Sequence, residues 1–206
     1  MKLGKIVLSM MLLLSSSVMS AEQENESVDA SRAHIEAKHH EEGDFYMVPK
    51  LLLTLGDTYT EEAKEGEAEA KLEGDVGGGV GLDLGYRVGY GFAVEFDFAY
   101  AHTNVTKHVE SEEAISAGAN YYSYGLDLIY GYHVNETFVT FAKVGWEIEQ
   151  ERISDFDISG TNNGFAYAVG LEYGLNEHWA VLGEYEGSLI DGPRGNSVFV
   201  GTSYTF

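Results

Sequence analysis

Charged side chains alternate with large apolar ones along much of the chain between residues 44 and 206. In a strand, residues i and i+2 share a face, so this alternation collects the charges on one side of a sheet. The acids on that side are Asp83, Glu95, Asp97, Asp127, Glu147, Glu172, Glu184 and Glu186, and the bases are Lys50, Arg87 and Lys143. Charges taken out of bulk water must be paired, hydrated or neutralised. Because three bases cannot pair eight acids, we expect water, bound cations or protonated carboxyl groups to cover the difference.

Two kinds of chemistry suit such a set of charges. One is a hydrogen-bonded network of ion pairs that fills the interior of a barrel and fixes the register of its strands. The other is a narrow conduit that prefers cations, because rings of acidic side chains favour cations. The segment 56–75 adds eight acids and two lysines. We expect solvated charge there, with divalent cations or surface partners as the alternative.

Histidines offer the other side chains with reactive or metal-binding chemistry. His34, His39 and His40 stand among glutamates, a composition that can hold Zn²⁺ or Ni²⁺ loosely. Their spacing matches no metal motif, so we expect a solvated segment and no metal site. No serine forms a recognisable nucleophile motif near His102, His108 or His178. We therefore expect no catalytic residue and no cofactor.

Composition narrows the class of protein. The formal net charge is −22, with 34 acidic and 12 basic side chains, which argues against nucleic-acid binding and against docking on anionic lipid surfaces. The absence of cysteine excludes disulfides and thiolate chemistry. With 25 glycines, 14 tyrosines and only 2 prolines, the chain is more typical of many strands than of disorder.

The N-terminal residues have the features of a secretory signal peptide. Lys2 and Lys5 precede an apolar stretch over residues 6–14, and we place cleavage after Ser20. Residues 1–20 are therefore the expected signal peptide, with a retained membrane anchor as the alternative. Residues 21–43 are polar and acidic and predict a periplasmic leader segment. No later segment has the ~20 apolar residues of a membrane helix, so a membrane protein of this sequence must be a closed barrel.

Period-two alternation predicts eight strands in the domain at 44–206. The clearest is 92–100, where four Phe or Tyr side chains and Val94 share one face opposite Ala93, Glu95, Asp97 and Ala99. The eight predicted strands are 45–55, 80–86, 92–100, 122–132, 138–148, 165–173, 179–185 and 198–206.

The connections between these strands alternate in length. Three are short turns, at 87–91, 133–136 and 174–178, and four are longer or more polar, at 56–75, 101–117, 150–162 and 187–195. The stretches around the short turns, GYRVGYGFAVEF, GYHVNETFVTF and EYGLNEHWAVL, form a weak internal repeat. Short turns at one end and longer loops at the other are typical of outer-membrane barrels. An even number of strands then places both termini at the end with the short turns, on the periplasmic side.

The nature of the two faces separates a membrane barrel from a soluble β-domain. A soluble barrel or sandwich buries its aromatic face and keeps its charges outside. Here the apolar face is large and aromatic, and the opposite face holds Gly, Ala, Ser and charged residues that suit the crowded inside of a narrow barrel. We expect aromatic girdles at both rims. One comprises Tyr86, Phe92, Tyr132, Phe138, Tyr173, Trp179 and Phe206; the other comprises Tyr100, Tyr122, Trp146, Phe165 and Tyr185.

The ending NSVFVGTSYTF resembles the C-terminal signal of outer-membrane barrels, in which a terminal Phe closes an alternating apolar strand. Residues 44–206 as a whole resemble the OmpA-type transmembrane domain and OmpX-like small barrels of Gram-negative bacteria. The resemblance implies an all-β, eight-stranded antiparallel up-and-down barrel in the cell outer membrane. It also implies that Tyr204 and Phe206 form an assembly signal for the barrel-assembly machinery. Since the sequence ends at Phe206, we expect no peptidoglycan-binding domain.

The function expected from the sequence is that of an integral outer-membrane barrel with a structural, envelope-integrity or surface-interaction role. The expected partners are outer-membrane lipid and lipopolysaccharide, the assembly machinery, and cations in the lumen or loops. A narrow cation-preferring porin is the alternative. A third function, modification of lipid A, is known among eight-stranded outer-membrane barrels and needs a Ser-His-acid set, which this sequence does not suggest.

Overall fold

A computed structural model describes residues 43–61, 69–109, 113–156 and 158–206. The predicted signal peptide at 1–20 and all but the last residue of the acidic segment 21–43 lie outside these ranges, as do His34, His39 and His40. The described chain consists of β-strands and one 3₁₀ turn, η3 (Ser154–Phe156). No helix in the described ranges is long and apolar enough to cross a membrane.

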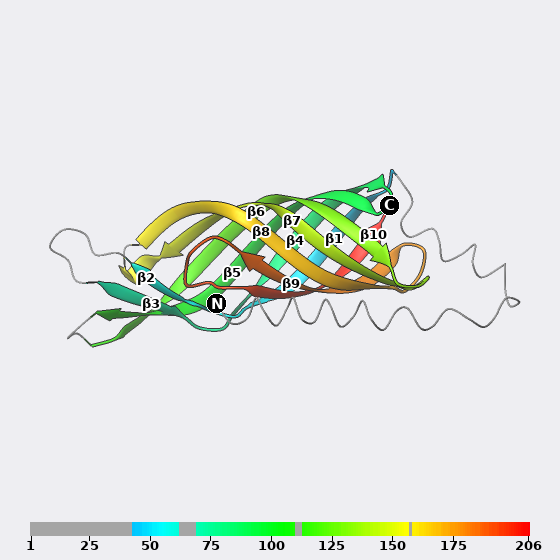
Figure 1. Cartoon of the computed structure of the whole chain (residues 1–206). Helices are drawn as coiled ribbons and strands as arrows, with labels where there is room; N and C mark the ends of the chain where they lie inside the picture. Colours follow the sequence, from blue (N-terminus) through cyan, green and yellow to red (C-terminus); the bar gives the residue numbers. More distant parts are fainter. Residues whose placement is uncertain (1–42, 62–68, 110–112, 157) are drawn as a thin grey trace, which may run out of the picture. The chain divides into compact units, whose positions relative to one another are not determined.

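Eight strands pair antiparallel with their neighbours and close into a ring (Figure 1). The last strand pairs with the first, with Leu51 opposite Val200 and Lys50 opposite Gly201. The strands of the ring, in chain order, are β1 (Phe45–Thr54), β4 (Gly77–Gly89), β5 (Phe92–Val109), β6 (Ile115–His133), β7 (Phe138–Ile153), β8 (Ile158–Gly174), β9 (Trp179–Ser188) and β10 (Ser197–Thr205). This architecture confirms the predicted eight-stranded up-and-down barrel.

Three of the four longer connections differ from their prediction, because strands run far into them; in the fourth, 187–195, β9 continues only to Ser188. β5 and β6 continue through most of 101–117, and β7 and β8 continue through most of 150–162. Two further strands, β2 (Thr58–Glu61) and β3 (Ala70–Gly74), lie within the predicted connection 56–75. β3 pairs with the far part of β5, from Gly74 opposite Val105 to Ala70 opposite Val109, beyond the residues that pair with β4. The sheet therefore extends well past the predicted strand ends.

Three tight turns join strands at one end of the ring, which we call the turn end. The turn between β4 and β5 has Tyr90 and Gly91 at φ 55° and 82°, the paired positive angles of a type I′ hairpin. The other two share one device. Asn135 Oδ1 accepts bonds from the backbone N–H groups of Thr137 and Phe138, and Asn176 Oδ1 does the same for His178 and Trp179. Two of the three members of the sequence repeat therefore share an Asx turn, and the third forms a type I′ turn.

Both described ends of the chain also lie at the turn end, where Phe206 N donates to Phe45 O at 3.0 Å. The opposite end, which carries β2 and β3, we call the loop end (Figure 1). An even number of strands requires this placement.

Large apolar side chains cover the outside of the ring. Leu51, Leu126, Leu171 and Val200 are each between 58 and 68% exposed, a pattern that suits a surface covered by lipid rather than by water. At the turn end, Phe92 packs on Tyr130 and Phe138 on Tyr173 with ring centroids 5.0 and 4.9 Å apart. Nearer the loop end, Tyr100 packs on Tyr122 at 5.1 Å and Trp146 on Phe165 at 4.9 Å. These pairs form the two aromatic girdles.

The spacing of the girdles fits a membrane. Phe92 and Tyr100 are eight residues apart on β5. At ~3.3 Å per residue and a strand tilt of ~40°, they lie about 20 Å apart along the barrel axis, close to the ~25 Å apolar band of outer-membrane barrels. Two predicted girdle members, Tyr100 and Tyr185, are half-buried and bonded to the side chains of Asn120 and Asn196 respectively.

The interior is less uniformly small than predicted. Tyr46 and Phe141 point inward, and each stands directly opposite a glycine of the neighbouring strand, Gly85 and Gly170. A Cβ added at Gly85 would lie 2.0 Å from the Tyr46 ring, and one at Gly170 would lie 2.2 Å from the Phe141 ring. Glycine is therefore required where an inward aromatic ring packs against the backbone of the neighbouring strand in a narrow barrel.

We expect Gly170→Ala to lower the free energy of unfolding by about 1–3 kcal/mol, because the added methyl group overpacks the Phe141 ring. The matched control is Gly160→Ala on the same strand, where a Cβ meets nothing within 4 Å. The measurement is urea unfolding of the protein in lipid vesicles, followed by tryptophan fluorescence and gel mobility. Equal unfolding midpoints for the two variants would contradict the proposed packing.

Candidate functional site

A layer of buried charges crosses the middle of the barrel. Lys50 Nζ lies 2.7 Å from Asp83 Oδ2 and 3.6 Å from Glu184 Oε1. Lys143 Nζ lies 3.2 Å from Asp83 Oδ2 and 2.9 Å from Glu184 Oε2, and it also pairs with Glu95. All five side chains are at most 6% exposed. We call these five residues the ionic layer.

The ionic layer joins opposite walls. Lys50 is on β1 and Lys143 on β7, four steps apart in a ring of eight strands, and both lysines reach Asp83 on β4 and Glu184 on β9. Neighbouring groups complete the layer. Tyr46 Oη donates to Glu95 Oε2 at 2.9 Å, and Lys50 Nζ lies 4.3 Å from the centre of the Phe199 ring. Mutual pairing of this kind offsets the cost of removing the charges from water.

Clusters of buried apolar side chains lie on both sides of the ionic layer. Toward the turn end, the buried cluster consists of Tyr46, Val48, Ala93, Ile129, Phe141 and Leu182. Toward the loop end, a larger cluster contains Leu52, Leu72, Ala99, Ala101, Val105, Ala117, Ala119, Tyr121, Ile153 and Phe199. The ionic layer therefore has an apolar cluster on each side of it.

A second group of acids lies just above the ionic layer, toward the loop end. Asp97, Glu147 and Glu186 line a cavity of about 10 Å³ together with Lys50 and Asp83, a volume suited to about one water molecule. Asp127 is buried beside them, with Gly125 and Gly145 leaving room for the carboxylates of Asp97 and Asp127. Within the described residues, no ion pair joins Asp97, Asp127 or Glu186 to a basic side chain.

The sequence did not identify a fourth inward base, Arg194. This residue belongs to the connection between β9 and β10, which folds into the mouth of the barrel and buries Pro193 and Arg194. Arg194 Nη2 lies 3.0 Å from Glu147 Oε1, and Nε lies 2.6 Å from Glu149 Oε2. Burial alone lowers the pKa of Arg194, but the carboxylates of Glu149 and Glu147 more than offset it, and its pKa is raised. The shortage of bases among the predicted inward residues was the available signal for such a residue.

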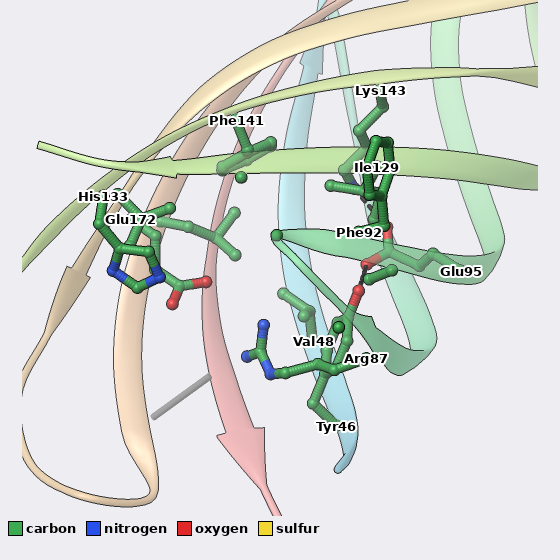
Figure 2. A pocket seen from close by; sticks show the side chains of 16 residues that line it. Tyr46, Val48, Arg87, Phe92, Glu95, Ile129, His133, Phe141, Lys143 and Glu172 are labelled. Carbon is green, nitrogen blue, oxygen red and sulfur yellow. Dashed lines mark hydrogen bonds and ion pairs between the residues drawn. The ribbon is translucent and has the colours of Figure 1, made fainter. Parts of the chain in front are cut away.

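Arg87 and Glu172 lie at the turn end, where they line an open cavity of about 80 Å³ (Figure 2). Arg87 packs over the Tyr46 ring with its guanidinium carbon 4.5 Å from the ring centre, and His133 lines the same cavity. Deeper in the barrel the cavity is lined by the apolar cluster that contains Phe141 and Ile129, and by Glu95 and Lys143 of the ionic layer.

The described histidines are dispersed rather than grouped. His102 Nδ1 lies 3.1 Å from Asn120 Oδ1, His108 lies 3.8 Å from Glu73, and His178 Nδ1 lies 3.0 Å from Thr205 O at the turn end. Among the described residues, no group of three or more His, Asp or Glu side chains has the arrangement of a metal site.

A closed ring of antiparallel strands, an apolar belt with two aromatic girdles, and a charged interior define an integral barrel of the bacterial outer membrane. The chain belongs to the outer membrane protein beta-barrel domain family, whose model matches residues 8–206. Its location is therefore the outer membrane, where lipid surrounds the barrel. No curated protein matches the chain.

Several solved structures share the fold at low sequence identity. The outer membrane protein OprG from Pseudomonas aeruginosa is similar with a TM-score of 0.65 and 17% identity, over 82% of this chain and 98% of OprG. Neisserial surface protein A is similar with a TM-score of 0.55 and 15% identity, over 79% and 97% of the two chains. Ail of Yersinia pestis, in a complex with the heparin analogue sucrose octasulfate, is similar with a TM-score of 0.52 and 19% identity, over 81% of this chain and 100% of Ail. These likenesses concern the fold alone.

Arg194→Met should lower the free energy of unfolding by about 3 kcal/mol, because it leaves Glu147 and Glu149 buried without a base. Converting both acids as well, with Glu147→Gln and Glu149→Gln, should restore much of the loss. Lys71→Ala is the control, since Lys71 and Glu73 form an exposed pair at 3.9 Å, which contributes little. The measurement is again urea unfolding in vesicles. No difference between Arg194→Met and Lys71→Ala would contradict a structural role for Arg194.

Proposed function

We propose that the barrel is a closed scaffold with a structural and surface-interaction role in the outer membrane. The observation that carries this proposal is the ionic layer between Lys50 and Lys143, which spans the lumen from wall to wall. The apolar clusters on each side of it support the same role, because they occupy part of the lumen that a water-filled path would need. The loop end, which we infer to be extracellular, carries the extended sheet of β2, β3 and β5 to β8 into the surrounding water.

A narrow cation-preferring conduit is the second candidate. It is supported by the excess of inward acids, since Asp97, Asp127 and Glu186 would attract a cation into the lumen. Cations in this part of the lumen are therefore proposed partners under either function. A lipid A-modifying activity has less support, because His102, His108 and His178 contact Asn120, Glu73 and the Thr205 carbonyl respectively, rather than a serine.

Planar-bilayer recording on the refolded full chain separates the two candidates. We expect no unitary conductance steps, because the ionic layer and the apolar clusters leave no continuous water path. Protein recovered from the same vesicles must show the heat-modifiable gel mobility of a folded barrel, so that silence does not result from failed insertion. Discrete steps would overturn the closed scaffold. If those steps also lose cation preference in the double variant Asp97→Asn, Asp127→Asn, they would establish the conduit.

We also propose that Tyr204 and Phe206 form the signal by which the barrel-assembly machinery recognises the last strand. Both rings face outward at the turn end. The Tyr204 ring packs 4.8 Å from Trp179 and 5.2 Å from Phe206, and Phe206 is 68% exposed. An exposed terminal ring contributes little packing to the finished barrel, so its value lies in recognition during assembly.

Deletion of Phe206 should reduce the amount of folded protein in the outer membrane of cells several-fold, with little effect on spontaneous refolding in detergent. The measurement compares heat-modifiable mobility in membrane fractions with that of refolded protein. Phe45→Ala is the control, because Phe45 is a comparably exposed ring at the same end. An equal loss in cells and in detergent would show that Phe206 acts through stability instead.

A further inference from the structure

At the loop end, one edge of the barrel wall pairs with no other strand of the described residues. β8 pairs with β7 along its whole length, from Ile158 opposite Ile153 to Tyr173 opposite Phe138. On its other side, β8 pairs with β9 only from Ala166 onward, because β9 ends at Ser188. Residues 158–164 therefore form a strand edge that no described strand covers. In Figure 1 this part of β8, drawn in yellow, reaches beyond the connection that follows β9.

The unpaired backbone groups of this edge can be assigned by alternation. In an antiparallel strand, the N–H and C=O of one residue point to the same side, and successive residues alternate sides. Phe165 O accepts a bond from Leu189 N, so the backbone N–H and C=O groups of Phe165 point away from β7. By the same parity, Asn163, Thr161 and Ser159 present their N–H and C=O groups outward. Three donors and three acceptors thus stand in a row at strand spacing.

The side chains along this edge leave it open. Residues 159–163 are exposed at every position, on both faces of the strand, and a Cβ added at Gly160 would meet nothing within 4 Å. The segment Ser-Gly-Thr-Asn-Asn contains no charged residue and no proline. Natural sheets usually protect exposed edges with lysine, proline or bulges, and none of these is present here. An edge of this kind is suited to receive another strand.

A polar cavity of about 500 Å³ lies beside the edge. It is bordered by Ile158 and Thr161–Asn163 of β8, by Tyr59 and Leu72 of the β2–β3 hairpin, by Glu151, and by Leu189–Pro193. Its lining includes two carboxylates, Asp191 and Glu151, and no lysine or arginine. A side chain entering this cavity from an added strand would therefore meet negative charge.

We propose that the edge of β8 at 158–164 binds an extended basic peptide segment as an added antiparallel or parallel strand. Backbone bonds to Ser159, Thr161 and Asn163 hold the segment, and its Lys or Arg side chains enter the cavity beside Asp191. The proposal deepens the surface-interaction role and rests on it, since it identifies the class of partner. Strand addition gives affinity through main-chain bonds and selectivity through the side-chain pocket.

The charge at this edge also argues against a second copy of the chain as the occupant. Pairing two β8 edges would bring Asp191 and Glu151 of one copy toward those of the other, in a protein whose formal net charge is −22. Like charges at an interface oppose association. A basic segment meets the opposite situation.

The test uses the full chain in detergent micelles or nanodiscs and fluorescence polarisation of a labelled peptide of about eight residues that alternates lysine and threonine. We expect saturable binding. A peptide alternating glutamate and threonine should not bind, and the lysine peptide with alternate backbone nitrogens methylated should bind at least about tenfold more weakly, because it cannot pair along the edge.

Variants of the protein assign the site. Thr161→Pro removes an outward N–H that β7 does not use and places a ring on the edge, so binding should fall at least about tenfold while folded gel mobility is retained. Thr161→Val, which keeps the backbone, should bind as the unaltered protein does. Asp191→Asn should weaken the lysine peptide several-fold.

Three outcomes would overturn the proposal: no binding of the lysine peptide, equal binding of the methylated peptide, or full binding by Thr161→Pro. Binding of a neutral oligosaccharide in the cavity without peptide binding would assign the site to a glycan instead. Because these measurements do not involve conductance, their failure leaves the closed-scaffold proposal standing, and a conducting barrel would leave the edge site to be judged on its own.

Discussion

Backbone hydrogen bonding within a solvent that offers no partners is the constraint on which this structure depends. In hydrocarbon, each unpaired N–H or C=O costs several kcal/mol, so the strand edges of a membrane-spanning sheet must meet. The pairing of β1 with β10 meets that requirement and creates an enclosed interior. The sites of charge, the glycines opposite Tyr46 and Phe141, and the outward aromatic rows are all consequences of a narrow closed wall with lipid on one side.

The strands could be predicted from the sequence where their outward face contacts lipid. Along 92–100 one face meets lipid and the other meets the lumen, so the residues alternate strictly and the strand is evident from the sequence. Beyond Tyr100 on β5 the outward face is polar, with His102 exposed, while Ala101 and Val105 on the inward face are buried. At 159–163 on β8 both faces are exposed. The outward apolar row ends in both stretches although strand pairing continues, which is why they resembled loops. The β2–β3 hairpin was missed for the same reason.

The interior was predictable where parity alone decides orientation. Lys50, Glu95 and Lys143 follow from counting along strands, but Arg194 belongs to a connection and reaches Glu147 and Glu149 only through the path of that connection. The inward rings of Tyr46 and Phe141 depend on which residue lies across the sheet. Gly85 and Gly170 are 39 and 29 positions away in sequence, and only the register brings each opposite its ring. The direction of a side chain can be read from its own strand, but its cross-strand partner depends on residues far away in the sequence.

The two lysines that meet shared carboxylates from opposite walls also act as a check on assembly. A slip of one residue in β1, β4, β5, β7 or β9 would turn a carboxylate or an ammonium group outward into lipid and break its ion pairs. A misaligned barrel therefore loses part of this pairing energy and also places a charge in lipid, whereas the correctly closed ring makes every pair. The interior charges thus make the final state of the barrel distinct from its near neighbours, and they couple five strands into one cooperative unit.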